Sequence, residues 1–206
     1  GGVDPGLIQC IGNVWTTGAL DVSSLPEGPV LITADHDDAA GNSAPQASVT
    51  VTKDTIAPTV AEIQAWTWAL SSPANGSISN DGTPIVSLTG AAAENGGTVQ
   101  VYDVVTCTGA QGVVQTITGG ATTHNDISYA TDGSADGIKA YSVIVADAFG
   151  NTSLCADISL GYTYDTVVPT VEITTAATIT SANEGSYSYS GTCSEDGQQV
   201  VTSVGG

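Results

Sequence analysis

Basic residues are almost absent from this chain. Two Lys or Arg residues stand against 21 Asp and Glu, which gives a formal net charge of -19 over 206 residues. Binding to nucleic acid needs Lys and Arg that neutralise phosphates, and anionic membrane surfaces attract the same side chains. We therefore expect neither partner. The charge is typical of a chain that recruits divalent cations, or of one that works at high salt, where self-repulsion is screened.

Long apolar runs and methionine are also missing. No run approaches the roughly 20 apolar residues of a transmembrane helix, so we expect no membrane span. The sequence has no Met and no signal-peptide pattern, and we interpret it as a mature piece of a longer polypeptide. Hydrophobic residues make up 41% of the chain, so it should fold rather than stay disordered.

Strand patterns dominate, and no segment has a convincing helical pattern. Short alternating runs rich in Val, Ile, Thr and Tyr are separated by Gly, Asn, Asp and Pro. The strand-like segments are residues 30–35, 47–55, 83–90, 98–106, 140–147, 158–166 and 185–192. Regularly spaced short strands of this kind predict an all-β fold built from β-sandwiches.

Two segments of the chain repeat the same order of elements. Residues 32–60 and 144–171 each contain a strand, a D-A-x-G-N turn, a second strand and a D-T-x-x-P-T-V linker. Downstream of the two linkers, residues 89–99 and 190–200 also match, through E-N-G and E-D-G. Repetition at this spacing is the signature of tandem structural units.

These repeats predict one complete unit and two partial ones. Residues 58–168 carry both the early and the late landmarks, residues 1–57 only a late half, and residues 169–206 only an early half. The chain enters and leaves a seven-stranded sandwich at opposite ends, so the two halves should not meet within one molecule. We expect completion by a neighbouring copy or by the adjacent repeat of a longer polypeptide. Either arrangement is a linear array.

The combined motifs resemble the bacterial immunoglobulin-like (Big-type) tandem repeats of large calcium-binding surface adhesins and exported filament proteins. The resemblance covers essentially the whole chain. It implies tandem immunoglobulin-like β-sandwiches, one complete and one split into two complementary halves, at the bacterial cell surface or in the extracellular space. It also implies a structural function, as an adhesin stalk or surface fibre stiffened by calcium at the domain junctions. The cysteines and the extra acidic residues Asp35 and Asp37 depart from the family pattern.

Acidic side chains from separate segments are expected to meet at these junctions. Two loops of a sandwich lie at the end where the chain enters, so Glu94 and Asp147 should converge with the linker residue Asp54. Carboxylates and carbonyls are the ligands that Ca²⁺ prefers. The predicted ligands are Asp54, Glu94, Asp147 and Asn151 in the complete unit, and Asp165, Glu195, Asp196, Asp35, Asp37 and Asp38 in the split one. The alternative is that Asp and Asn only build the turns.

The four cysteines are dispersed and lack zinc-site spacing, which favours disulfides in an exported protein. The repeat places Cys10 and Cys107 at equivalent positions, so we predict that Cys107 pairs with Cys155 and Cys10 with Cys193. The second bond would join the two halves of the split unit, and it could join two chains. Buried free thiols are the alternative.

No catalytic motif is present: we find no Ser-His-Asp order, no G-x-S-x-G and no phosphate-binding loop, and we expect no enzyme. Trp66 and Trp68 share a face if their segment is a strand, which could form a platform for a glycan or a host receptor. A glycan- or receptor-binding module of an adhesin is therefore the alternative function. Packing in the core or at a sheet edge is the simpler interpretation of the two Trp residues.

Overall fold

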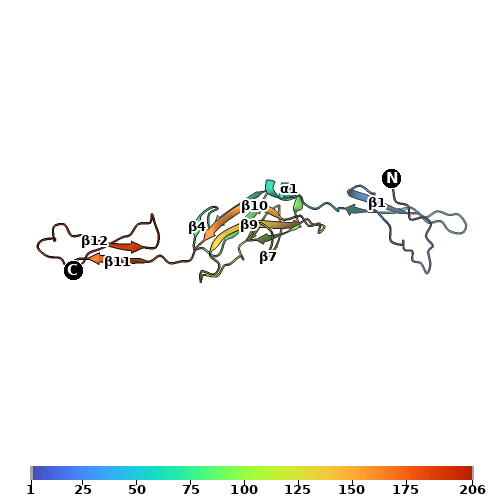
Figure 1. The fold of residues 1–206 in the computed structure, drawn as a ribbon. Coiled ribbons are helices and arrows are strands. Elements are labelled where there is room, and N and C mark those ends of the chain that lie inside the picture. Colours follow the sequence, from blue (N-terminus) through green and yellow to red (C-terminus); the bar gives the residue numbers. More distant parts are fainter. Residues whose placement is uncertain (1, 206) are drawn as a thin grey trace.

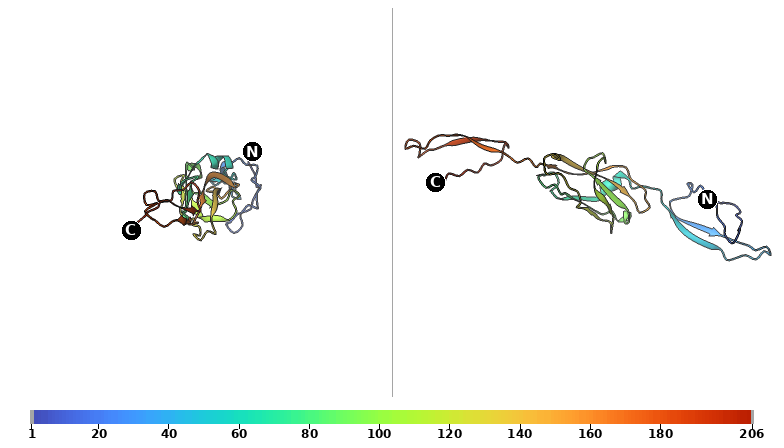
Figure 2. Two further views of the ribbon diagram at one scale, coloured as in Figure 1. Left: turned by 60° about the vertical axis from the view of Figure 1, so that its left-hand side comes forward. Right: turned by 90° about the horizontal axis from the view of Figure 1, so that it is seen from below.

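The chain forms a central two-sheet unit with one β-hairpin on each side (Figure 1). This computed structural model describes residues 2 to 205. The three parts lie in a row, joined by short linkers, and the linkers enter and leave the central unit at opposite ends (Figures 1 and 2). Most of the regular structure is strand, as predicted.

Two sheets make up the central unit. The smaller has the order β3-β5-β8, and the larger has the order β4-β10-β9-β6-β7. Neighbouring strands are antiparallel except for β4 and β10, which run parallel. The strands are β3 (Thr67–Ser72), β4 (Ile78–Ser79), β5 (Ile85–Thr89), β6 (Thr98–Tyr102), β7 (Ala110–Thr116), β8 (Thr122–His124), β9 (Gly137–Ala146) and β10 (Ala156–Tyr164).

One hydrophobic core lies between these sheets. Val86 and Leu88 of β5 alternate with less buried residues, and so do Val99 and Val101 of β6, because successive side chains of a strand point to opposite faces. All buried hydrophobic residues of the described chain lie between Ile63 and Tyr164. The core therefore belongs to the central unit alone, and its two facing sheets have the arrangement of a β-sandwich.

A short helix precedes the first strand of the sandwich, so the expectation that the chain lacks helices is wrong here. Helix α1 (Val60–Ala65) begins with a capping box, in which the side chains of Thr59 and Glu62 each bond to the other's backbone N–H. Ile63 is its buried residue and joins the core. The Thr-x-x-Glu spacing is the sequence signal for this helix start. A single helical turn (η1, Ala92–Glu94) lies between β5 and β6.

The two flanking hairpins are β1 (Gly28–Ala34) with β2 (Ala47–Lys53), and β11 (Val171–Ala176) with β12 (Tyr189–Cys193). The alternating pattern predicts β1, β2 and β12 but not β11, and neither hairpin is buried. In the first hairpin, Ile32 and Val49 face each other in the register and are 46% and 55% exposed. The division into one complete and two half units stays a prediction, since no second molecule is present to cover these faces.

Candidate functional site

The D-A-x-G-N turn of the central unit is organised around the Asp147 carboxylate. Its Oδ1 accepts hydrogen bonds from the backbone N–H groups of Phe149 and Asn151, at 2.8 and 2.9 Å. Its Oδ2 accepts a third bond, at 2.7 Å, from the Asn151 side-chain amide. Gly150 has a φ of 91°, a left-handed conformation that suits a residue without a Cβ atom.

The first D-A-x-G-N turn has the same hydrogen bonds. The Asp38 Oδ1 atom accepts from the backbone N–H groups of Ala40 and Asn42, at 2.9 and 2.8 Å, and its Oδ2 accepts from the Asn42 amide at 2.8 Å. The pKa of Asp38 is lowered, mainly by the Asn42 side-chain bond. Burial opposes ionisation of Asp147, but hydrogen bonds from Asn151, Phe149 and Gly150 outweigh it and lower the pKa. Both carboxylates are therefore ionised and build their own turns.

The incoming linker meets this turn at Asp54. The Asn151 side-chain amide donates to the backbone carbonyl and to the carboxylate Oδ1 of Asp54, both at 3.3 Å. The same carboxylate accepts from the backbone N–H of Ile56 at 3.1 Å, which fixes the first bend of the linker. The amide of Asn151 thus connects the D-A-x-G-N turn to the segment that enters the domain.

Glu94 completes a cluster of acidic residues at this end of the sandwich. Its pKa is raised, first by partial burial and then by the negative charges of Asp147, Glu62 and Asp54. Its carboxylate therefore lies in the electric field of three other carboxylates. We call Asp54, Glu62, Glu94 and Asp147 the junction cluster. Glu62 is not among the predicted ligands, although the Thr-x-x-Glu spacing places it beside the linker.

The junction cluster has the right donor chemistry for a hard divalent cation, because all of its ligands would be oxygens. Glu94 is the member whose charge a cation would relieve. Within residues 2–205, however, no three acidic, His or Cys side chains lie close enough to share an ion, and both Asp147 oxygens already serve the turn. A bound ion would therefore need Glu94 and Asp54 to approach each other.

The remaining predicted ligands do not meet within one chain. Asp35 accepts two bonds from Gln46, Asp165 accepts the Val167 backbone N–H, and Asp196 accepts the Gly197 backbone N–H. Asp35, Asp37 and Asp38 follow β1 in the N-terminal hairpin, whereas Glu195 and Asp196 follow β12 in the C-terminal hairpin. These two hairpins lie on opposite sides of the sandwich (Figure 1).

A second device fixes both linkers, and sequence reasoning missed it. Glu27 accepts the backbone N–H and the hydroxyl of Thr55 at 2.9 and 2.8 Å, and Asp136 accepts the same two groups of Thr166 at 3.0 and 2.8 Å. Each acidic residue directly precedes the Gly that begins β1 or β9. The recurring acidic-Gly pair, at a similar distance before each D-T, was the available signal.

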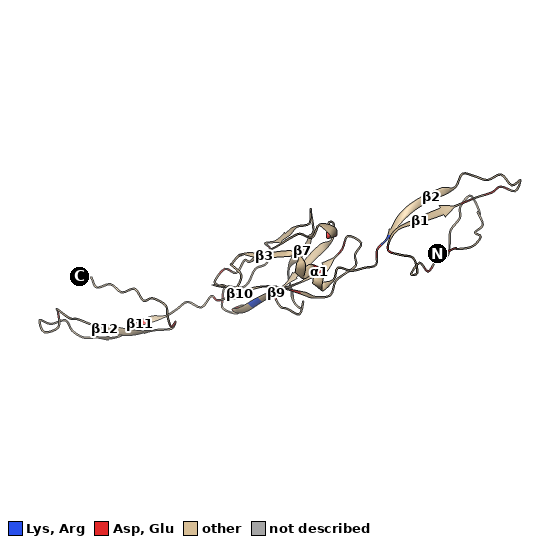
Figure 3. Ribbon diagram, turned by 90° about the horizontal axis from the view of Figure 1, so that it is seen from above, with Lys and Arg blue, Asp and Glu red and all other residues tan. Residues whose placement is uncertain are grey.

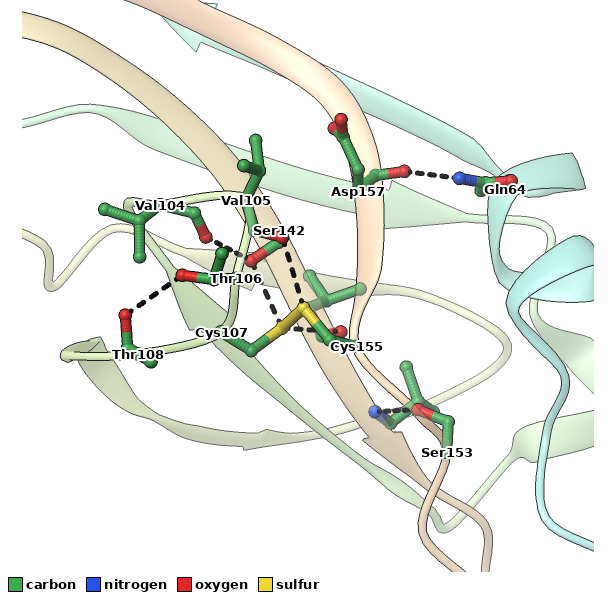
Figure 4. The surroundings of a disulfide bond; sticks show 12 residues. Gln64, Val104, Val105, Thr106, Cys107, Thr108, Ser142, Ser153, Cys155 and Asp157 are labelled. Atoms are coloured by element: carbon green, nitrogen blue, oxygen red, sulfur yellow. Dashed lines mark hydrogen bonds between the residues drawn. A yellow bond between two sulfur atoms is a disulfide. The ribbon is translucent and has the colours of Figure 1, made fainter.

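One disulfide is present in the described chain, between Cys107 and Cys155 (Figure 4). It ties the loop after β6 to the start of β10, across 48 residues of sequence. The Ser142 hydroxyl donates to the carbonyl of Val104 beneath this loop and lies 3.2 Å from the Cys107 sulfur. The disulfide therefore pins an irregular loop to the edge of the sandwich.

Cys10 and Cys193 are free and exposed in the chain. The proposed equivalence of Cys10 with Cys107 does not match the local structure. Cys10 directly precedes a turn closed by Ile11 and Val14, whereas Cys107 lies in the disulfide loop before β7. Counted from the D-A-x-G-N turns, Gln46 holds the place of Cys155. A bond between Cys10 and Cys193 stays a prediction for contacts between units.

Trp66 and Trp68 do not form an open platform. Both are partly buried and pack against the hydrophobic core, and the Trp68 indole N–H donates to the carbonyl of Ile63 at 2.8 Å. Trp66 follows α1 as its C-cap, so the two residues do not belong to one uninterrupted strand. This packing favours the structural interpretation of the pair, and glycan or receptor binding stays a prediction.

The two Lys residues are both engaged. Lys53, at the end of β2, lies 3.2 Å from the Glu27 carboxylate, and Lys139, on β9, lies 4.3 Å from the Tyr129 ring centroid (blue in Figure 3).

Across residues 2–205, no helix combines the length and apolarity that crossing a bilayer requires. Comparison with protein-family models finds no match to this chain, and comparison with curated proteins finds none. Function is therefore inferred from the geometry described above.

Proposed function

We propose that the chain is a structural repeat of an extracellular rod or filament, built from tandem immunoglobulin-like sandwiches of the bacterial type. The observation that carries this proposal is the shared construction of the two linkers. Each begins with an Asp whose carboxylate accepts the N–H two residues on, followed by a Thr held by two hydrogen bonds to an acidic residue. A linker fixed in this way sets the orientation of each unit relative to the one before it.

The position of the linkers supports an extended assembly. The chain enters the central sandwich at one end and leaves it at the other, so successive units are added along one axis (Figures 1 and 2). Contacts that add units along an axis without closing generate rods and filaments. The disulfide fits an oxidising, extracellular environment.

Calcium binding at the junction cluster is part of this proposal. Glu94, Asp54 and the carbonyls of the linker would supply oxygen ligands, with Asp147 and Glu62 adding negative charge. A cation there would offset the burial and the repulsion that together raise the Glu94 pKa. It would also hold the linker against the domain and so stiffen the junction. The same residue types recur in the split unit, as Asp165, Glu195 and Asp38.

The test is to follow particle length by electron microscopy and light scattering while calcium is added and then removed with a chelator, with and without reductant. We expect linear particles one sandwich wide that lengthen or stiffen with calcium. Compact particles of fixed stoichiometry would overturn the rod. Linear particles indifferent to chelator would overturn only the calcium part of the proposal.

A further inference from the structure

The hairpin β1–β2 is the structural counterpart of β9–β10 in the sandwich. The end pairs of the first hairpin are Gly28 with Lys53 and Ala34 with Ala47. They correspond to Gly137 with Tyr164 and to Val143 with Ala156 in the sandwich. Beyond each hairpin, one isolated β-bridge closes the same D-A-x-G-N turn. It joins Asp37 to Ser43 in the first copy and Ala146 to Thr152 in the second. The one difference is an irregularity between Asp157 and Leu160 of β10.

The segment before β1 also has a counterpart. Ile11 and Val14 exchange two backbone hydrogen bonds across Gly12 and Asn13, whose φ angles are 62° and 66°. Thr118 and Ala121 do the same across Gly119 and Gly120, at 61° and 78°. In the sandwich this turn joins β7 to β8. Residues 2–53 thus contain counterparts of the β7–β8 turn and of strands β9 and β10.

The C-terminal part contains counterparts of β3, β5 and β6, which the N-terminal part lacks. Hairpin β11–β12 is antiparallel like β3–β5, and each hairpin has one irregularity, between Ile173 and Thr175 or between Leu70 and Ser72. Beyond it, the E-D-G of residues 195–197 matches the E-N-G before β6, so residues 199–203 match β6. These residues lie along a groove whose lining includes Val171, Ile173, Val200 and Val201.

Equivalent positions differ sharply in burial. Tyr141 of β9 is 0% exposed and Tyr162 of β10 is 2% exposed, whereas their counterparts Ile32 and Val51 are 46% and 45% exposed. In the sandwich, β6 pairs with β9, and the β3–β5 sheet covers the same core. The exposed faces of the hairpins are therefore the faces that strands of the complementary set cover in the complete unit.

We propose that a second copy of this chain supplies those strands, and that residues 199–203 of one copy insert as a strand beside β1 of the next. In the sandwich, Val99 lies opposite Val145 and Gln100 opposite Ile144. Transferred by the repeat, this register places Val200 opposite His36 and Val201 opposite Asp35 of the neighbouring copy. Hairpin β11–β12 then covers the apolar face of β1–β2.

A second copy is the favoured occupant because residues 2–205 of one copy do not bring the two sets of strands together. The two hairpins lie at opposite ends of the row, with the sandwich between them (Figures 1 and 2). The insertion also repeats the linker contact of the sandwich, since Asn42 of the neighbouring copy would donate to Asp165 as Asn151 donates to Asp54. This inference rests on the proposed function, because strand exchange at both ends builds the proposed filament.

Cross-linking tests the register. In a Cys10→Ser, Cys193→Ser background, Val201→Cys and Asp35→Cys should form disulfides between chains under oxidised glutathione, because directly opposed strand residues lie within disulfide reach. Non-reducing gels should show a ladder of multimers. The control pairs Val201→Cys with Leu31→Cys, four residues away on the same side of β1, and should stay monomeric. Equal ladders from both pairs would overturn the register.

A matched pair of charge substitutions tests the burial. Val51→Asp places a carboxylate on the face equivalent to the buried Tyr162, and Thr50→Asp places one on the opposite face of the same strand. We expect Val51→Asp to weaken self-association by about tenfold or more, since burying an unpaired charge is costly. Thr50→Asp should associate like the unmodified chain. Both variants should keep the unfolding temperature of the sandwich, which neither residue contacts.

The outcomes separate this inference from the proposed function. Linear particles that form without the Val201–Asp35 cross-link, and that tolerate Val51→Asp, would overturn strand insertion and leave the rod. A chain that stays monomeric at every concentration would overturn completion by a second copy. A fusion of two copies, which links the halves covalently, would then show whether the rod survives.

Discussion

Asn151 donates from one side-chain nitrogen to both Asp147 and Asp54, so a single amide joins a domain turn to the linker that enters the domain. Asn42 makes the equivalent bond to Asp38 and has no linker partner within its own chain, by the hydrogen bonds of residues 2–205. Comparison of the two turns therefore distinguishes the hydrogen bonds that form the turn from those that bind the linker. The Asp38 turn builds only itself, and the Asp147 turn also binds the incoming linker.

Replacing Asp147 by Ala should destabilise the sandwich. The Phe149 and Asn151 N–H groups would lose their acceptor in a turn where Asp147 is buried, which costs about 1 to 3 kcal/mol. Asp38→Ala removes the same set of bonds outside the core and is the matched control. Urea unfolding followed by Trp fluorescence should show a lower midpoint for the first variant alone. Equal midpoints would show that the turn does not contribute to the stability of the sandwich.

Replacing Asn151 by Ala should loosen the linker more than it destabilises the fold. The bonds to Asp54 are long, at 3.3 Å, so we expect faster amide hydrogen exchange at Thr55 and Ile56 with a small change in the unfolding midpoint. Asn42→Ala, which removes the same turn amide without a linker contact, should leave those two amides unchanged. Unchanged exchange in Asn151→Ala would contradict a role in the junction.

The strands that alternate apolar and polar residues could be predicted, because burial on one face leaves a period of two. The strands β3, β4, β7, β8 and β11 were not singled out. Of these, β4 is only two residues long and β7 has irregular pairing, so neither has a clean alternation. Helix α1 is not predicted because six residues are too few to show a helical repeat of apolar residues, although the sequence contains its capping box.

At the junction, the expectation that Asp54, Glu94 and Asp147 approach one another rests on sandwich topology, in which two loops lie at the end where the chain enters. The roles of the carboxylates could not be predicted. An Asp side chain can accept hydrogen bonds within its own turn or bind a cation. Which of the two it does depends on hydrogen bonds that form only in the folded state. The clamps of Thr55 by Glu27 and Thr166 by Asp136 were missed because they join residues about thirty positions apart.

Glu94→Gln tests the calcium proposal. Without calcium, removing this charge should leave the sandwich as stable or more stable at pH 7, because the raised pKa shows that the ionised form is disfavoured. With calcium, the unmodified chain should gain stability and the variant should gain little. Thermal unfolding with and without calcium measures both effects. Glu184→Gln, at an exposed position in the C-terminal part, is the control and should respond like the unmodified chain.

Removal of the Cys107–Cys155 disulfide should destabilise the sandwich by about 2 to 4 kcal/mol, because the bond closes a loop of 48 residues in the unfolded chain. The double variant Cys107→Ser, Cys155→Ser should unfold at a lower denaturant concentration. Cys10→Ser with Cys193→Ser should leave that midpoint unchanged and should remove any reductant-sensitive multimers. A midpoint shift in the second variant would show that Cys10 or Cys193 contributes to the stability of the sandwich.

The buried His124 should make the sandwich sensitive to mild acid. Its side chain is 0% exposed, and neither ring nitrogen has a hydrogen-bond partner within residues 2–205. Burial lowers its pKa from 6.5, and the negative charge of Asp126 and the nearby backbone of Val113 oppose that shift without reversing it. The unfolded chain binds a proton near pH 6.5 while the folded chain does not, so the His124 contribution to stability is full above that pH. It should decline as the pH falls toward the folded-state pKa.

This window is separate from that of the turn carboxylates, because the pKa of Asp147 is lowered from 3.8 and its contribution is lost only below about that pH. Urea midpoints between pH 5 and 8 should therefore fall on acidification in the unmodified chain and stay nearly flat in His124→Leu. His36→Leu changes an exposed histidine and should keep the original slope. An unchanged slope in His124→Leu would contradict the assignment of this acid sensitivity to His124.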